Sequence, residues 1–342
     1  MNRKELVKKL ELLKPALSEE LSAIFGCYVF KENALYGWNG SSLAIVAPFE
    51  WDGTPFAVNG KAVLGLLQNC SFEDVDFTFT KTEVEIEAGK SQFKLPILGK
   101  DAFIFDEPEV PETVSFDVGE QTAELIEICR STSATDHTLP ALMGICFDLK
   151  NGYIYSSEGD VITRAELGGN KKGIYTVPNL FIDAFIKIRD DLENKVCTLA
   201  FTDEWVCADF EDSYTVYGRT IKSTVDFAKL IDKTLKGKEI EYTDLPEGFG
   251  EALARARVLT DAESKPTFLG VEGGKLLITA ESSYGELYDE LPFKGHEDLE
   301  TTSVHAQLVE RALKFCDRIA LLPNCTCYSN GTTIFHLIGN AK

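Results

Sequence analysis

Apolar residues recur along the chain at two spacings, one typical of helices and the other typical of strands. Leu6, Leu10, Leu13 and Leu17 follow the helical spacing near the N-terminus. Elsewhere, runs such as residues 77–79 (Phe-Thr-Phe) alternate apolar and polar side chains, which predicts strands with one solvated face. The pattern therefore predicts an α+β protein built from antiparallel sheets and helices.

The same order of elements occurs three times along the chain. In each third, a helix is followed by a strand, a turn and a strand, then by a second helix and two more alternating runs. Landmarks in the hairpin turns, Asn33, Asn151 and Gly274, are 118 and 123 positions apart. Near-equal spacing of this kind predicts a repeated domain.

The repeat also predicts where domains and helices begin and end. The three domains are expected at residues 1–112, 113–232 and 233–342, joined near Asp106–Pro111 and near Asp232–Lys238. The six helices are expected at residues 6–17 and 61–67, at 120–132 and 180–189, and at 249–259 and 306–318.

Charge and targeting signals narrow the possible functions. The 342 residues include 34 Lys and Arg against 55 Asp and Glu, a net charge of −21. Phosphates repel an acidic surface, so nucleic acid could be held only if the basic residues lie together on one surface. No membrane span or signal peptide is predicted, which favours the cytoplasm.

The sequence contains few motifs that indicate catalysis or metal binding. It contains no Gly-x-x-x-x-Gly-Lys-Ser/Thr loop, His-Glu-x-x-His, Gly-x-Ser-x-Gly or Cys-x-x-Cys motif. The nine cysteines are expected to be buried thiols, and the close pair Cys325 and Cys327 lacks further metal ligands nearby. We therefore expect no catalytic residues, metal or cofactor. A metal-dependent enzyme that uses paired carboxylates and Mg²⁺ stays open as a rival.

The order and spacing of several short segments resemble the bacterial-type DNA polymerase III beta sliding clamp. Examples are Leu12-Leu13-Lys14-Pro15, residues 89–95 (Gly-Lys-Ser-Gln-Phe-Lys-Leu), residues 142–147 (Leu-Met-Gly-Ile-Cys-Phe) and residues 254–259 (Ala-Arg-Ala-Arg-Val-Leu). The resemblance covers nearly the whole chain and implies a processivity factor for DNA replication. It implies a head-to-tail homodimer that closes into a ring around duplex DNA, with helices lining the hole and sheets outside. Departures from the family pattern indicate a phage-encoded or otherwise divergent member.

The resemblance implies two contact regions between subunits. Phe93 and Leu95 in the first domain match the family's subunit interface on one side, and Val258 and Leu259 in the third domain match it on the other. The alternative is that these four are ordinary core residues.

If the helices line a hole, their faces away from the core should carry positive charge. Lys4 and Lys8 lie opposite the leucine stripe of the first helix, and Arg311, Lys314 and Arg318 fall on one stripe of the last. Such residues would contact phosphates without reading sequence. The residues expected to bind DNA are Lys4, Lys8, Lys9, Lys14, Lys61, Arg130, Lys187, Arg189, Arg255, Arg257, Arg311, Lys314 and Arg318. A basic loop typical of the family reads Ser-Glu-Glu-Leu-Ser here, at residues 18–22.

The resemblance also implies an apolar cleft that binds short peptides of a DNA polymerase and a clamp loader. By position, the cleft would use Leu142, Ser157, Gly159, Ile162, Val225, Leu230, Phe335 and Leu337. The family's basic pair becomes Asp160-Val161, and its tail becomes residues 338–342 (Ile-Gly-Asn-Ala-Lys), so the peptide accepted here is expected to differ. A protein-interaction module with the same fold that does not encircle DNA is the alternative, and a monomer in solution would favour it.

Overall fold

The computed structural model describes residues 1–31, 33–51, 53–98, 105–109, 114–136, 138–169, 171–211, 213–223, 225–294 and 297–341. The expected boundary between the first two domains, at residues 112 and 113, lies outside them. The chain forms two compact units. Unit 1 is Met1–Ala123 with Val177–Lys222, and unit 2 is Glu124–Thr176 with Ser223–Lys342.

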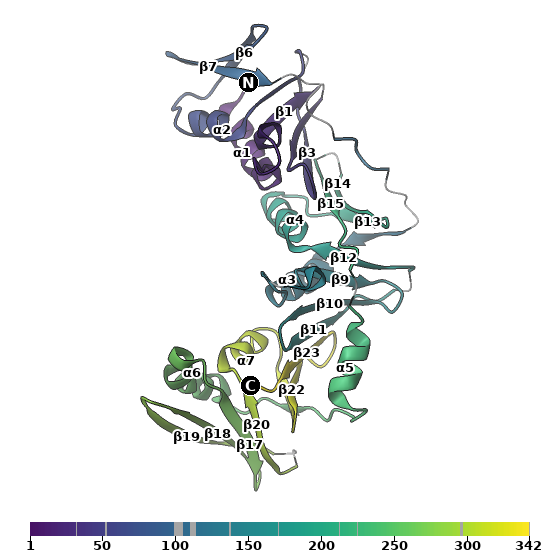
Figure 1. Cartoon of the computed structure of the whole chain (residues 1–342), viewed down its shortest axis with the longest axis vertical. Coiled ribbons are helices and arrows are strands. Elements are labelled where there is room, and N and C mark those ends of the chain that lie inside the picture. The colour runs from purple at the N-terminus through teal and green to yellow at the C-terminus, as the bar shows by residue number, and fades with distance from the viewer. Residues whose placement is uncertain are drawn as a thin grey trace. The chain divides into compact units, whose positions relative to one another are not determined.

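One motif, a helix followed by three consecutive antiparallel strands, builds both units (Figure 1). We call each copy a repeat. Unit 1 contains three of them. Repeat 1 consists of α1 (Arg3–Leu13), β1 (Cys27–Lys31), β2 (Ala34–Trp38) and β3 (Leu43–Pro48). Repeat 2 consists of α2 (Gly60–Gln68), β5 (Asp76–Phe79), β6 (Glu83–Ala88) and β7 (Ser91–Leu98). Repeat 4 consists of α4 (Asn179–Asp191), β13 (Cys197–Phe201), β14 (Trp205–Phe210) and β15 (Tyr214–Arg219).

Unit 2 holds most of repeat 3 and all of repeats 5 and 6. Repeat 3 consists of α3 (Glu120–Ser131), β9 (Gly144–Asp148), β10 (Tyr153–Glu158) and β11 (Val161–Glu166). Repeat 5 consists of α6 (Phe249–Thr260), β17 (Thr267–Glu272), β18 (Lys275–Ser282) and β19 (Gly285–Pro292). Repeat 6 consists of α7 (Ala306–Ala312), β21 (Arg318–Leu322), β22 (Cys325–Ser329) and β23 (Ile334–Gly339).

Short strands precede five of these helices, and one helix stands outside the repeats. The strands are β4 (Phe56–Asn59), β8 (Ser115–Val118), β12 (Ile174–Pro178), β16 (Thr243–Asp244) and β20 (Leu299–Val304). The additional helix is α5 (Phe227–Leu235), between repeats 4 and 5. The sequence did not predict α5, and the expected domain boundary at residues 232 and 233 falls inside it.

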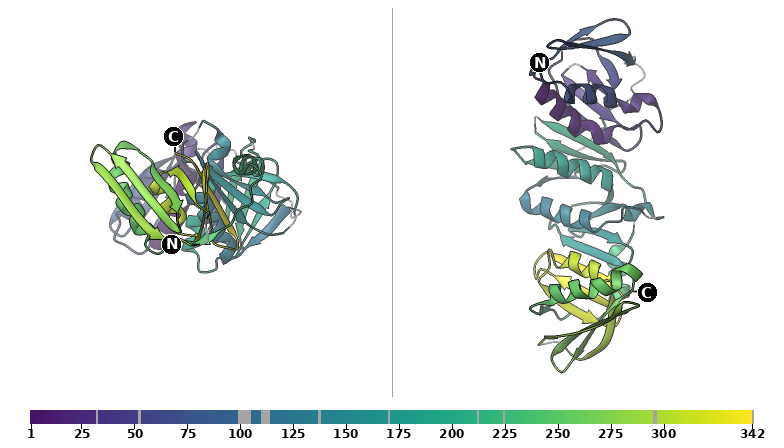
Figure 2. Two further views of the ribbon diagram at one scale, coloured as in Figure 1. Left: turned by 90° about the horizontal axis from the view of Figure 1, so that it is seen from below. Right: turned by 90° about the vertical axis from the view of Figure 1, so that its left-hand side faces the viewer.

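The strands form long sheets because neighbouring repeats join edge to edge. Unit 1 holds one sheet in the order β5-β6-β7-β4-β1-β2-β3-β15-β14-β13-β8. Unit 2 holds β12-β9-β10-β11-β23-β22-β21-β16 and, separately, β19-β18-β17-β20. In unit 1, α1, α2 and α4 lie on the same face of the sheet (Figure 2). In unit 2, α3 and α7 lie on one face of the eight-stranded sheet and α5 lies on the other (Figure 1).

Two of the edge-to-edge joints follow one rule, in which the last strands of two repeats pair antiparallel. β3 of repeat 1 pairs with β15 of repeat 4, and β11 of repeat 3 pairs with β23 of repeat 6. At the second joint, Thr163 and His336 are directly opposite each other, and the Thr163 hydroxyl lies 2.8 Å from His336 Nδ1. The last strands of repeats 2 and 5, β7 and β19, are left over.

All six predicted helices are confirmed, but the last one is shorter than expected. α7 ends at Ala312, because the Asp317 N–H donates a 3.1 Å hydrogen bond to the Ser329 carbonyl and so draws the backbone into the sheet. Arg318 is therefore the first residue of β21 and does not extend a helical stripe from Arg311. The predicted stripe through Arg318 is wrong.

Candidate functional surfaces

The lysines of unit 1 that were expected to bind DNA lie on or beside its three helices, and several are tied to nearby groups. Lys8 Nζ lies 2.9 Å from Asp191 Oδ2, and Lys187 Nζ donates a 2.8 Å hydrogen bond to the Glu11 carbonyl. Lys9 donates to the Pro48 carbonyl, and burial lowers the pKa of its ammonium group. These three lysines therefore brace α1 against its neighbours as well as contributing charge.

Four lysines of the predicted set project freely into solvent. Lys4 is on α1, Lys14 begins the short 3₁₀ turn after it, Lys61 is in the first turn of α2, and Lys314 follows α7. Within the described part of the chain, none of the four forms an ion pair within 4.0 Å. Lys14 and Lys61 share the lining of a pocket of about 490 Å³ with Gln68. These ammonium groups are available to an external anion such as a phosphate.

Arg189 does not belong to the exposed set. Its side chain is only 4% exposed, and its guanidinium pairs with the carboxylate of Glu120. A buried guanidinium needs such a partner, because an unpaired buried charge is strongly destabilising. The prediction that Arg189 contacts DNA is therefore wrong: it holds the start of α3 against α4.

Three arginines of the predicted set in unit 2 are also ion-paired. Arg255 lies 2.9 Å from Asp289, and Arg257 lies 2.8 Å from Asp261 while also bonding Glu310. Arg311 pairs with Glu158 and donates to the Ser131 carbonyl. Arg130 is half-buried beside Ser133.

The six repeat helices together are close to electrically neutral. They contain 11 of the 34 basic residues but only 10 of the 55 acidic residues of the chain. The remainder, 23 basic against 45 acidic, lies outside them. The acidity of the protein is thus concentrated in strands and connections. Acidic residues are therefore fewer on the helices than elsewhere, as predicted. The helices are nevertheless neutral overall and do not form a uniformly basic face.

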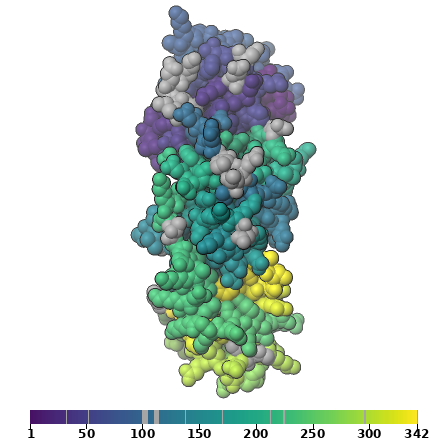
Figure 3. Space-filling view, turned by 90° about the vertical axis from the view of Figure 1, so that its right-hand side faces the viewer, coloured from purple at the N-terminus to yellow at the C-terminus, as the bar shows by residue number. Residues whose placement is uncertain are grey.

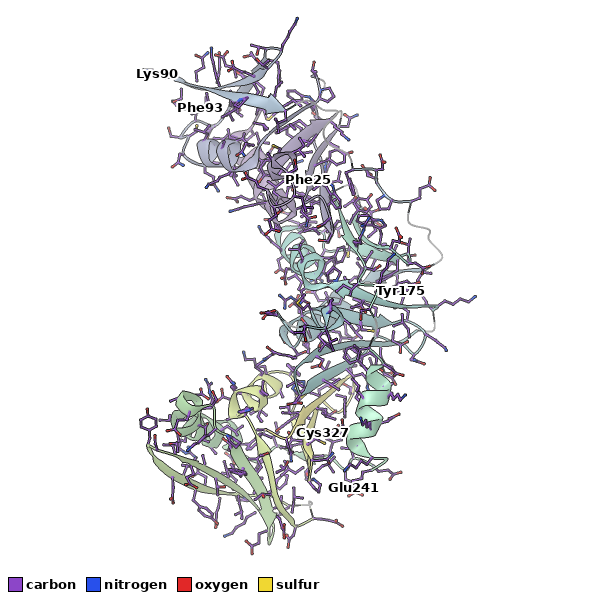
Figure 4. The ribbon with its side chains drawn as sticks, in the orientation of Figure 1. Phe25, Lys90, Phe93, Tyr175, Glu241 and Cys327 are labelled. Atoms are coloured by element: carbon purple, nitrogen blue, oxygen red, sulfur yellow. The ribbon has the colours of Figure 1, made fainter. Side chains whose placement is uncertain are left out.

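The four residues predicted at the subunit interface lie on β7 and on α6 beside β19. Phe93 and Leu95 are half-buried on β7, which pairs fully with β6 but with β4 only through Ile97 and Leu98 (Figure 4). β19 is the outer strand of its sheet. Beside it on α6, the Val258 side chain is 77% exposed and Leu259 is half-buried. A side chain this exposed is not part of the core, so the alternative that Val258 is an ordinary core residue does not hold.

The third predicted surface, the cleft, coincides with one hydrophobic cluster of unit 2. Leu142, Ile162, Phe335 and Leu337 belong to this cluster, with Val225 packed against it. Strand register explains the grouping, since Ile162 pairs with Leu337 and both point to the same face. The structure thus brings these five residues together in one cluster, and their role in binding a peptide stays a prediction.

Two other predicted cleft residues shape the hairpin that ends the cleft. The Ser157 hydroxyl donates a 2.7 Å hydrogen bond to the Val161 carbonyl, which steadies the turn between β10 and β11. Gly159 has a φ of 60° in that turn, a conformation that favours glycine. Both roles are structural, whatever else binds there.

Leu230, which was also predicted to line the cleft, lies outside the buried part of the cluster. It is 41% exposed on α5, whereas Phe227 and Ile231 on the same helix are buried in the cluster. The sequence reasoning missed these two residues. The signal was present, because Phe227, Ile231 and Leu235 are spaced by four and form one helical stripe.

The thiols and acids give no indication of catalysis. All nine cysteines are free thiols, and eight are buried, as expected for small apolar side chains. Burial raises the pKa of Cys129, for example, to about 12, so that thiol stays protonated and unreactive at neutral pH. Over the described residues, no group of three or more His, Cys, Asp or Glu could hold a metal ion. A search of the same residues found no helix with the length and apolar character to cross a bilayer.

Solved structures with the same fold include several beta clamps. The DNA polymerase III subunit beta from Pseudomonas aeruginosa matches 100% of this chain and 99% of its own, with a TM-score of 0.85 and 14% identity. The beta subunit from Thermotoga maritima matches 100% and 98%, with a TM-score of 0.85 and 16% identity. The Helicobacter pylori beta clamp bound to a DNA ligase peptide matches 100% and 99%, with a TM-score of 0.81 and 16% identity. No protein-family model and no curated protein sequence matches the chain. The likeness confirms the three-domain clamp fold over the full length.

Proposed function

We propose that this protein is a DNA sliding clamp, a homodimeric ring that encircles duplex DNA and tethers a polymerase to it. The observation that carries the proposal is the incomplete pairing of two strands: β7 pairs with β4 through only two residues, and β19 is the outer strand of its sheet. The shared fold of solved beta clamps supports it.

Ring closure follows from applying the pairing rule once more. The last strands of repeats 1 and 4, and of repeats 3 and 6, already pair within the chain. The same rule would pair β7 of one copy with β19 of a second copy. A two-fold axis then pairs both left-over strands of both copies at once, which covers these two edges against aggregation.

The two strands carry charged side chains of opposite sign, and three of these already have a partner in the chain: Lys94 with Glu85, Asp289 with Arg255, and Glu290 with Lys275. β7 carries Lys94 and no carboxylate, and β19 carries Glu286, Asp289 and Glu290 and no basic residue. Val258 and Leu259 flank β19, and Phe93 and Leu95 lie on β7. Apolar anchors framed by opposite charges are typical of a specific interface.

The oligomeric state tests ring closure. We expect light scattering coupled to gel filtration to give a mass of two chains, twice 37.9 kDa, at micromolar concentration. A monomer at that concentration would favour an interaction module that does not encircle DNA. One observation already favours that second candidate, namely the ten carboxylates that share the helices with the basic residues.

DNA would be held loosely by the exposed lysines. Ammonium groups on flexible side chains contact phosphates without reading bases, which is what sliding requires. Replacing Lys4, Lys14 and Lys61 by Gln should weaken binding to a short duplex roughly tenfold. It should also flatten the dependence of log K on log salt by about 0.9 for each phosphate that is no longer neutralised. Both effects should be the same for duplexes of different sequence.

A control with the same change in net charge separates direct phosphate binding from bulk charge. It replaces Lys81, Lys150 and Lys294, exposed residues in or beside connections between strands, by Gln. We expect this control to keep the salt slope of the unmodified protein. If it loses as much affinity as the first variant, the helix lysines do not form the DNA surface.

Partners are proposed to dock through short peptides at the cleft of unit 2. The Helicobacter pylori beta clamp with the same fold binds a DNA ligase peptide. Here the corresponding partners are a DNA polymerase and a clamp loader in the cytoplasm. The protein is proposed to act by topology alone, so no turnover of nucleic acid is expected with or without Mg²⁺.

A further inference from the structure

We propose that unit 2 carries a second binding pocket, separate from the cleft, that takes a carboxylate borne on an apolar body. The pocket lies beside the C-terminal half of α5, and its two hydrogen-bond donors are Arg164 of β11 and Tyr242, just before β16. Three observations carry the proposal: a guanidinium without an acceptor, a buried hydroxyl without a partner, and the charge at the border of the pocket.

The pocket is distinct from the cleft. It has a volume of about 270 Å³ and is formed where α5 meets the end of β11 and the start of β23. Of the eight residues expected to line the cleft, only Phe335 borders this pocket. Gly159, a cleft residue, lies in the turn before β11, at the opposite end of that strand. The side of unit 2 that carries α5 faces the viewer in Figure 3. A ligand in this pocket and a peptide in the cleft would therefore contact different ends of the same sheet face.

The guanidinium of Arg164 is positioned by two aromatic rings but has no hydrogen-bond acceptor. It lies 4.9 Å from the ring centroid of Tyr153 and 4.9 Å from that of Phe335. Strand register sets this position, because Arg164 is directly opposite Phe335 on β23. Among the described residues, no group accepts a hydrogen bond from Arg164 and no carboxylate pairs with it. Since cation–π contacts engage the faces of a guanidinium, its N–H groups stay available to a ligand.

The hydroxyl of Tyr242 is a second donor without a partner. Its oxygen is buried, and no hydrogen-bond partner contacts it among the described residues. Burial raises the pKa of this hydroxyl well above its ordinary range, so the group stays protonated and can donate. The charge of Arg164 acts on the same pKa in the opposite direction, which places the two donors near each other. A buried hydroxyl without an acceptor is destabilising, so an oxygen atom supplied by a ligand would stabilise it.

The remaining residues of the pocket decide which anion fits. Its walls include the apolar side chains of Ile231, Leu235 and Ile240. Glu166 and Asp232 are exposed at its border. Two carboxylates at this place repel a polyanion such as a nucleotide or a nucleic acid, whereas a single negative charge can pair with the guanidinium. The pocket therefore fits one carboxylate attached to an aromatic or branched aliphatic group, either as a free acid or as the C-terminal end of a protein chain.

Isothermal titration calorimetry with N-acetylphenylalanine tests the proposal, because this probe combines one carboxylate with an aromatic body. We expect the full-length protein to bind it with a dissociation constant of about a millimolar or lower. N-acetylphenylalanine amide keeps the body and lacks the charge, so it should bind roughly tenfold more weakly. A peptide of five glycines and a C-terminal phenylalanine distinguishes the two sources. Binding of this peptide assigns the pocket to chain ends, and binding of N-acetylphenylalanine alone assigns it to free acids; both results support the proposed pocket.

Three variants test the two donors. Arg164→Gln should weaken the binding of N-acetylphenylalanine roughly tenfold, because a charge-assisted hydrogen bond is lost. Tyr242→Phe keeps the ring and removes only the hydroxyl, so it should weaken binding roughly threefold. Lys172→Gln removes the same charge as Arg164→Gln from an exposed residue outside the pocket, and it should bind like the unmodified protein.

Equal affinity for the acid and the amide would overturn the proposal, since the pocket would then be an apolar cavity only. Absence of detectable binding at millimolar concentration would overturn it too, as would equal affinity of Arg164→Gln and the unmodified protein. Should Arg164→Gln not fold, Tyr242→Phe decides, and an unchanged affinity of that variant would overturn the proposal. None of these measurements involves DNA, the ring or the cleft, so their outcome is independent of the proposed clamp function.

Discussion

Replacing Val258 with glutamate is expected to convert the dimer into monomers. Val258 lies on α6 next to β19, and its side chain is 77% exposed in the single chain. In the proposed ring, the Val258→Glu carboxylate would be buried against an edge that already carries Glu286, Asp289 and Glu290. Removing the apolar side chain costs about 2 kcal/mol at each junction. Since the ring has two junctions, the dissociation constant should rise roughly a thousandfold.

The control for this prediction is Val196→Glu. Val196 is 50% exposed just before β13, so it undergoes the same chemical change at a site away from both left-over strands. Sedimentation velocity should show a dimer for Val196→Glu and a monomer for Val258→Glu at micromolar concentration. Thermal unfolding should show a cooperative transition for both variants, which confirms that both are folded. A Val258→Glu variant that remains dimeric would contradict the proposed junction.

Acid should destabilise the joint between β11 and β23 well above the pH at which carboxylates titrate. Burial, with a smaller contribution from the charge of Arg311, lowers the pKa of His336 from 6.5 to about 3. Below pH 6.5 the unfolded chain takes up a proton that the folded protein excludes, so stability falls as the pH falls toward 3. The full loss over this window is about 5 kcal/mol, at about 1.36 kcal/mol per pH unit. Above pH 6.5 this contribution is fully present.

The measurement compares urea unfolding at pH 7.5 and pH 5.0, a range in which most carboxylates stay ionised. We expect the unmodified protein to lose about 2 kcal/mol from His336 alone between these values. The His336→Gln variant has a neutral side chain at both pH values. Its free energy of unfolding should therefore fall by about 2 kcal/mol less than that of the unmodified protein. His305→Gln, a change of the half-buried histidine before α7, should retain the loss. If His336→Gln showed the same pH dependence as the unmodified protein, His336 would not be the group responsible.

The repeat could be predicted from the sequence because its signals are local. Leu6, Leu10 and Leu13 are buried on α1, as their spacing predicts. Asn33 and Gly274 adopt positive φ in the hairpin turns, as the turn residues predict. Helix periodicity and turn chemistry depend on a few neighbouring residues, so one sequence suffices to place the elements.

The errors share a different cause, namely contacts between residues far apart in the chain. Arg189 looks like an exposed basic residue until Glu120, 69 positions away, is placed beside it. Arg318 continues a helical stripe in the sequence. The hydrogen bond from the Asp317 N–H to the Ser329 carbonyl instead places it in a strand. α5 was interpreted as a linker because it is rich in lysine. Its apolar stripe can be recognised as a packing face only when the sheet that it covers is known.

The central claim is that topology, rather than affinity, holds this protein on DNA. The direct measurement assembles dissociated subunits in the presence of closed circular DNA and then removes free protein by gel filtration at high salt, where exposed ionic contacts are screened. The account predicts that protein stays with the circle and is released when a single restriction cut makes the DNA linear. Equal retention before and after the cut, or no retention on the circle, would contradict it.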